Sequence, residues 1–158
     1  MFHVCVAATL AVVLMAGTAW AECQPDRVEL RGDWGGATFR VTVADDPTEH
    51  ARGLMFVEEM PVDDGMIFIF RAPRRASFWM ENTLIPLDML FVDETGTVRH
   101  IHENATPMDR TPIMGGDSIL AVLEINGGLS EKFGIDVGTR LRHPGLPQNL
   151  AAWPCNAR

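Results

Sequence analysis

The 158-residue sequence lacks an excess of basic residues. It contains 13 lysines and arginines against 21 aspartates and glutamates, which gives a formal net charge of -8 at pH 7. Proteins that bind nucleic acids or anionic membranes usually present a basic patch or stripe. The composition therefore argues against both kinds of partner.

Long apolar segments are also missing from most of the chain. After residue 21 the longest apolar runs, at 66–70 and 87–92, have the length of strands. A helix that spans a membrane needs about 20 apolar residues. We therefore expect no membrane span.

The first 21 residues form a different kind of segment. Their apolar stretch, residues 4–16, is too short to cross a bilayer core of roughly 30 Å. Ala19, Trp20 and Ala21 follow it, with small residues at the two positions that a signal peptidase inspects. The sequence thus predicts a signal peptide over residues 1–21 and a mature periplasmic or secreted domain over residues 22–158.

The residues that covalent catalysis requires are scarce. The chain has no Gly-x-Ser-x-Gly motif and one lysine, Lys132. Cys5 falls within the predicted signal peptide, which leaves Cys23 and Cys155 in the mature domain. In an oxidising compartment we expect these two to form a disulfide that joins the ends of the domain. We predict no cofactor.

The mature chain consists mostly of short β-prone segments separated by turns. The sequence predicts a hairpin around the turn at 32–36 and another around the turn at 94–96. It predicts short helices over residues 46–55, with Asp46 as the N-cap, and over residues 129–133, ended by Gly134. The expected strands lie at about 28–30, 37–43, 66–70, 77–80, 86–93, 97–103, 118–125 and 137–142. We therefore expect a mainly β fold, a small single-domain β-barrel or sandwich with one or two short helices.

The segment 78–88 places a charged residue, Asp88, in an otherwise apolar strand. An ionised carboxylate there must find hydrogen-bond donors or raise its pKa. One hypothesis makes Asp88, Asn82 and Thr83 a binding or acid/base cluster at a barrel mouth, with Trp79 as its apolar wall. The alternative is that Asp88 accepts hydrogen bonds from nearby backbone amides and fixes the start of its strand.

Two further groups of residues suggest sites but lack specificity. His100 and His102 project from one face of a predicted strand, but a zinc or iron site needs a third protein ligand and the spacing of the later acids does not supply one. We therefore predict no metal site. The basic segment that holds Arg71, Arg74 and Arg75 could bind an anion, but such segments are more often solvated loops.

Several motifs together resemble the domain of unknown function 192 family of exported bacterial and archaeal proteins. They are Arg-Gly-Leu-Met-Phe at 52–56, Gly-Met-Ile-Phe at 65–68, the segment 78–88, His-Glu-Asn-Ala at 102–105, Leu-Glu-Ile-Asn-Gly-Gly at 123–128 and Gly-Ile-Asp-Val-Gly at 134–138. The resemblance covers about residues 41–141. It implies a compact β-rich barrel or sandwich and no activity. It points to seven polar positions where a shared site would lie: Arg52, Asn82, Thr83, Asp88, Glu103, Asn104 and Glu124.

Three functional hypotheses remain open. The first is an exported binding or accessory module that holds a small polar ligand, or a segment of another exported protein, near Trp79, Asn82 and Asp88. The second is a carboxylate-based hydrolase or lyase acting on a saccharide-like substrate, with Asp88 and either Glu103 or Glu124 as an acid/base pair. The third is a structural domain whose motifs specify only the fold.

Overall fold

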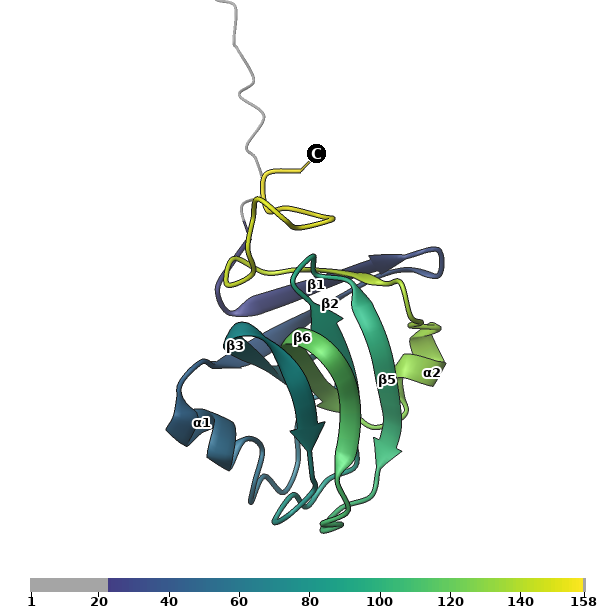
Figure 1. Ribbon diagram of the computed structural model, residues 1–158. Helices are drawn as coiled ribbons and strands as arrows, with labels where there is room; N and C mark the ends of the chain where they lie inside the picture. The colour runs from purple at the N-terminus through teal and green to yellow at the C-terminus, as the bar shows by residue number, and fades with distance from the viewer. Residues whose placement is uncertain (1–22, 158) are drawn as a thin grey trace, which may run out of the picture.

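The computed structural model describes residues 23–157, which form a curled, half-barrel sheet with two short helices (Figure 1). The strand order is β5-β4-β6-β3-β2-β1-β7. In chain order the elements are β1 (Arg27–Gly32), β2 (Gly35–Ala44), α1 (Pro47–Arg52), β3 (Asp64–Phe78), β4 (Leu87–Asp93), β5 (Val98–Ala105), β6 (Ile113–Asn126), α2 (Leu129–Phe133) and β7 (Arg140–Arg142). The predicted mainly β fold is confirmed.

The sheet curls until its two edge strands meet at one end. The predicted hairpins β1–β2 and β4–β5 are both present, and β2 and β3 run parallel with α1 in the connection between them. At the edges, Thr97 forms an isolated bridge with Arg140, and the Val98 N–H donates to the carbonyl of Thr139 at 2.9 Å. Hydrogen bonds between the start of β5 and the start of β7 therefore connect the two edge strands of the sheet.

The two faces of the sheet bury two separate apolar clusters. Leu90 and Leu123 belong to the cluster that also includes Leu129 of α2. Their neighbours along the strands, Phe91 on β4 and Val122 on β6, belong to the other cluster. That cluster includes Leu54, which lies just after α1. Side chains alternate between the faces of a strand. We call the second face, with Phe68, Met89, Phe91 and Val122, the α1-side face; Figure 1 shows the two helices on opposite sides of the sheet.

Three predicted boundaries were wrong. The helix α1 ends at Arg52 rather than Met55, because Gly53 adopts a φ of 48° that stops the helix. Residues 71–75 are not a loop: they lie in β3, whose pairing with β6 changes register between Ile69 and Arg74. The predicted strands 66–70 and 77–80 thus overlap one bulged strand, and the β6 strand that pairs with it begins at Ile113 rather than at 118.

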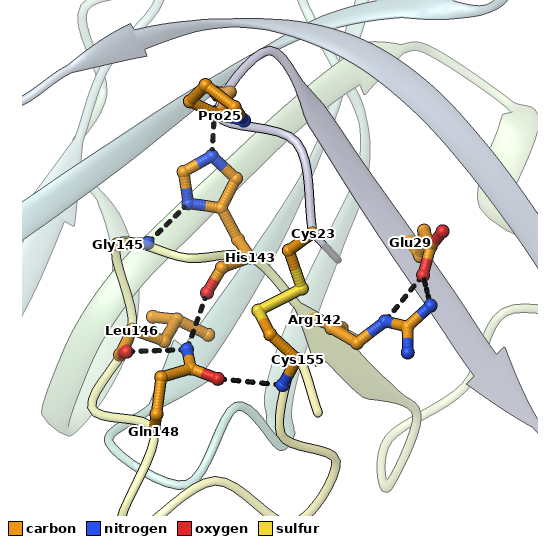
Figure 2. The surroundings of a disulfide bond; sticks show 9 residues. All are labelled: Cys23, Pro25, Glu29, Arg142, His143, Gly145, Leu146, Gln148 and Cys155. Atoms are coloured by element: carbon orange, nitrogen blue, oxygen red, sulfur yellow. Dashed lines mark hydrogen bonds and ion pairs between the residues drawn. A yellow bond between two sulfur atoms is a disulfide. The ribbon is translucent and has the colours of Figure 1, made fainter. Parts of the chain in front are cut away.

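The two ends of the described chain are fastened together (Figure 2). A disulfide joins Cys23 to Cys155, with their Cα atoms 5.2 Å apart, which is compatible with the predicted pairing. Beside it, the buried His143 donates from Nε2 to the carbonyl of Pro25 at 2.9 Å and accepts at Nδ1 from the N–H of Gly145 at 3.0 Å. Burial lowers the pKa of His143, and the neutral imidazole suits both bonds.

The predicted signal peptide, residues 1–21, lies outside the described residues. Between Cys23 and Ala157 no helix is long and apolar enough to cross a membrane.

Candidate functional site

A pocket of about 430 Å³ lies between α1 and the α1-side face of the sheet. The rings of Phe68, Phe70, Phe78 and Trp79 form the aromatic part of its wall. The charged or titratable residues that line it are His50, Arg52, Arg74, Glu81 and Glu124. The volume and the mixture of an apolar wall with a few polar groups are typical of small-molecule sites.

Glu124 provides the acidic group on the sheet side of this pocket. It lies on β6 opposite Met66 of β3 and Met89 of β4, so its side chain projects from the α1-side face. The residue is 4% exposed, and its carboxyl group makes no hydrogen bond or ion pair with any part of residues 23–157. Burial raises its pKa to about 8. The carboxyl group is therefore mostly protonated at neutral pH when the pocket is empty.

The two arginines of the pocket are exposed, and His50 is half-buried. The guanidinium of Arg74 lies 5.1 Å from the centre of the Phe70 ring. The Nε2 atom of His50 is 2.9 Å from the carbonyl oxygen of Ala44, and its imidazole contacts Phe70 with the ring centres 5.2 Å apart. Neither Arg52 nor Arg74 makes an ion pair within the part of the chain that the structure describes.

The turn at 82–83 forms one side of the pocket entrance. Asn82 adopts a left-handed backbone, with φ of 55°, and its carbonyl accepts the N–H of Phe56 at 2.8 Å. The carbonyl of Thr83 accepts the N–H of Met108 at 3.0 Å. Thr83 is buried and lines the pocket, whereas Asn82 stands behind it and contacts the sulfur of Met55. Asn82 therefore shapes the turn rather than contacting a ligand.

Asp88 lies on the opposite face of the sheet from Glu124. In the β4–β6 register Asp88 is opposite Ile125, whereas Glu124 is opposite Met89. The Asp88 carboxylate is fully buried and accepts three backbone N–H groups, from Asn104 at 2.8 Å, Gly128 at 2.9 Å and Ser130 at 2.7 Å. These bonds match the hypothesis that Asp88 fixes local structure, and they tie the end of β5 and the start of α2 to β4.

The remaining candidates do not join the pocket. Glu103 and Asn104 are exposed on β5, and Asn104 has a left-handed φ of 51°. His100 is exposed and stacks on Phe91, with the ring centres 5.6 Å apart, and His102 is half-buried. From residue 23 to residue 157 no three histidine, cysteine, aspartate or glutamate side chains are grouped as a metal site would require.

The structure therefore brings together Arg52, Trp79, Thr83 and Glu124 and separates them from Asp88, Glu103 and Asn104. The sequence analysis did not single out His50, and it named Arg74 only within a segment that could bind an anion. The signal that could have found them is the alternation in β3, where Met66, Phe68 and Phe70 occupy one face beneath the short helix that carries His50.

Two solved structures and one family profile are similar to this chain. A solved structure of a protein of unknown function from Novosphingobium aromaticivorans DSM 12444 is 42% identical, with a TM-score of 0.73, over 85% of this chain and 93% of that chain. A suggested transcription regulator from Sinorhizobium meliloti 1021 is 39% identical, with a TM-score of 0.75, over 79% of this chain and 98% of that chain. No curated protein matches. The profile of DUF192, described as Uncharacterized ACR, matches residues 28–143, so the chain belongs to the DUF192 family.

Proposed function

We propose that this protein is an exported binding module that holds a small ligand in the pocket between α1 and the sheet. The observation that carries the proposal is Glu124, a buried carboxyl group that lines an aromatic pocket and has no partner within residues 23–157. Its carboxyl oxygens are open to the pocket rather than sealed in the core, because between residues 23 and 157 only the Ser130 hydroxyl oxygen is both fully buried and without a partner. A ligand that supplies the missing partner explains why such a group is present.

The surroundings of the pocket entrance support a ligand with an apolar portion. Trp79 is 49% exposed at the pocket, and the loops that meet at the 82–83 turn expose Phe56, Leu84 and Met108. Exposed apolar side chains that gather at one place commonly mark a binding surface. The same surface suits an apolar side chain of another exported protein as well as a small molecule.

The acid/base alternative receives no comparable support. Asp88 and Glu124 project from opposite faces of the sheet, and the carboxylate of Asp88 is occupied by three backbone amides. Glu103 is exposed on β5 and does not line the pocket. A glycosidase needs two carboxyl groups that flank one bond of the substrate.

Export is supported by two independent features of the chain. The apolar stretch and the Ala-Trp-Ala triplet stand at the start of the sequence, and the Cys23–Cys155 disulfide suits an oxidising compartment. Residues 1–21 contain no lysine, arginine, aspartate or glutamate, so the mature domain over 22–158 keeps the net charge of -8. That charge argues against a nucleic-acid partner for this protein.

The proposal is tested by mapping ligand binding with NMR. We expect members of a mixed library of small aromatic and aliphatic compounds to shift the backbone amide signals of Gly53, Phe70 and Ser77, which line the pocket. The substitution Ala51→Trp places a large side chain at the pocket wall and should weaken these shifts. Asp63→Asn, whose exposed side chain pairs with Arg40 and does not line the pocket, is the control and should leave them unchanged. A library that produces no pocket shifts, or shifts that Ala51→Trp leaves intact, would argue against a binding site here.

A further inference from the structure

We infer that the ligand of this pocket is an organic amine whose ammonium group pairs with the carboxylate of Glu124. The inference rests on the proposed function, since it names the chemical class of the ligand for the same pocket.

The first reason is the set of bonds that Glu124 lacks. An ionised carboxylate accepts several hydrogen bonds through its two oxygens, and a buried one needs such donors, a nearby positive charge, or both. Residues 23–157 supply Glu124 with neither. A protonated amine brings up to three donors and a positive charge in one group, whereas a hydroxyl brings one donor and no charge. An amine is thus the smallest group that completes the site.

The aromatic wall is the second reason. The faces of phenylalanine and tryptophan rings attract cations. Four such rings line the pocket, and Phe68 and Phe78 meet edge to face with their centres 5.1 Å apart. The guanidinium of Arg74 lies over the Phe70 ring, so the rings of Phe68, Phe78 and Trp79 are the ones left for a ligand cation. An ammonium group that enters the pocket therefore meets a wall suited to positive charge.

The other charged groups around the pocket do not take the place of the ligand. On α1, the His50 imidazole contacts the Ala44 carbonyl, and Arg52 is exposed. On β3, Arg74 is exposed over Phe70, and after β3 the carboxylate of Glu81 pairs with Arg110 at 3.1 Å. On β4, Asp88 faces the opposite side of the sheet. If the amine also carries an acidic group at its other end, the exposed guanidinium groups of Arg52 and Arg74 can contact that group.

Pairing with an amine links binding to pH. In the empty pocket burial raises the pKa of Glu124 to about 8, so near pH 7 the carboxyl group must lose a proton before it can pair with an ammonium group. The affinity for an amine should consequently rise about tenfold for each pH unit below this pKa and level off above pH 8. A neutral ligand should show no such rise.

The experiment compares three probes of nearly equal shape by titration calorimetry on the purified protein. They are benzylamine, which stays protonated from pH 6 to pH 8, uncharged benzyl alcohol and anionic benzoate. We expect benzylamine to bind most tightly, to gain about tenfold in affinity from pH 6 to pH 7, and to release a proton on binding, seen as a dependence of the heat on the buffer. Glu124→Gln should weaken benzylamine at least tenfold at pH 8 and abolish the pH dependence.

Two controls isolate Glu124. Because a histidine side chain can also change charge between pH 5 and 8, His50→Gln should retain the tenfold rise. Thermal unfolding establishes that Glu124→Gln is folded, and its affinity for benzyl alcohol should match that of the wild-type protein.

The outcomes separate the ligand class from the proposed function. Tighter binding of benzoate or benzyl alcohol in the pocket, or an affinity for benzylamine that does not vary with pH, would overturn the amine and leave a binding site for another class of ligand. If none of the three probes shifts the pocket signals and the wider library is also silent, both proposals fail.

Discussion

Two buried carboxyl groups on neighbouring strands of this protein have opposite surroundings. Asp88 accepts three backbone N–H groups, and Glu124 has no donor between residues 23 and 157. They are both buried because β4 and β6 lie in the middle of the sheet, with both faces covered. At the scale of single residues, the arrangement of donors therefore distinguishes a structural acid from a candidate binding acid.

Replacing Asp88 should destabilise the fold strongly. In Asp88→Asn the side-chain NH₂ group replaces one acceptor oxygen and faces backbone N–H groups, which are also donors. We therefore expect the free energy of unfolding to fall by about 2 to 4 kcal/mol. Urea unfolding followed by circular dichroism measures this loss. Asp63→Asn is the matched control, because that carboxylate is exposed and its ion pair with Arg40 spans 3.5 Å. A similar stability for the two variants would contradict the structural role of Asp88.

Replacing Glu124 should change how stability depends on pH. In the unfolded chain the carboxyl group ionises near 4.5 and in the fold near 8, so the folded state retains a proton that the unfolded state has lost. Its contribution to stability is complete below pH 4.5, declines as the pH rises, and is lost above about pH 8. We expect the wild-type protein to lose about 1 to 2 kcal/mol between pH 6.5 and pH 8, and Glu124→Gln to lose much less.

His143 defines the pH window in which this measurement is cleanest. Burial lowers its pKa below 6.5, so the stability that depends on its neutral form is present above pH 6.5 and is lost as the pH falls through the lowered pKa. Unfolding free energies from urea titrations above pH 6.5 therefore report on Glu124. Parallel curves for the wild-type protein and Glu124→Gln would show that the carboxyl group is not buried as described.

At the scale of elements, the short helix α1 holds one wall of the pocket. Asp46 caps it by accepting the N–H groups of Thr48 at 2.7 Å and Glu49 at 2.9 Å, and Pro47 begins it. No residue of α1 itself is buried, so the helix is held by its cap, by the contacts of His50 with Ala44 and Phe70, and by the following Leu54. The pocket therefore depends on a helix with little packing of its own.

Removing the cap should loosen this wall. We expect Asp46→Ala to cost about 1 kcal/mol and to speed hydrogen exchange at the amides of His50 and Gly53, whose N–H groups donate within the helix. The neighbouring Asp45→Ala is the control, since the Asp45 side chain accepts no capping bond. Equal exchange rates in the two variants would indicate that tertiary packing, rather than the cap, holds α1.

The sequence predicted the elements with strong local signals and missed those that depend on pairing. The turn at 94–96 and Gly134 marked the hairpin and the end of α2, because turn geometry is encoded by a few adjacent residues. The continuation of β3 through Arg74 was not predicted, because its exposed, polar residues resemble a loop. Arg74 continues the strand because it pairs with Ile119 of β6, and the local sequence does not show this pairing.

At the scale of the whole molecule, the disulfide joins segments that are 132 residues apart (Figure 2). The C-terminal tail it holds also contacts the turn between β4 and β5, since the N–H of Ala152 donates to the carbonyl of Thr95 at 2.8 Å, and nearby Arg142 of β7 pairs with Glu29 of β1. The crosslink, the tail and the ends of the sheet form one connected region.

Breaking the crosslink should lower stability without changing the fold. We expect the double variant Cys23→Ser, Cys155→Ser to lose about 2 to 5 kcal/mol, because its unfolded chain regains the freedom that the closed loop removed. Guanidinium unfolding with and without reductant measures this. Reductant should lower the wild-type midpoint to that of the variant and leave the variant unchanged. If the fully reduced wild-type protein has the same guanidinium midpoint as the oxidised protein, the disulfide does not stabilise the fold.

The sequence by itself determined the mainly β fold, the family and four of the residues that line the pocket, because strand alternation, turns and family motifs are local patterns. Tertiary structure alone decided the roles of the two buried acids. In a strand covered on both faces, the sequence does not show which face a carboxyl group points toward or which donors meet it there. The β4–β6 register sends Asp88 to the backbone amides near α2 and Glu124 to the aromatic pocket, since a shift of one position along a strand reverses the face.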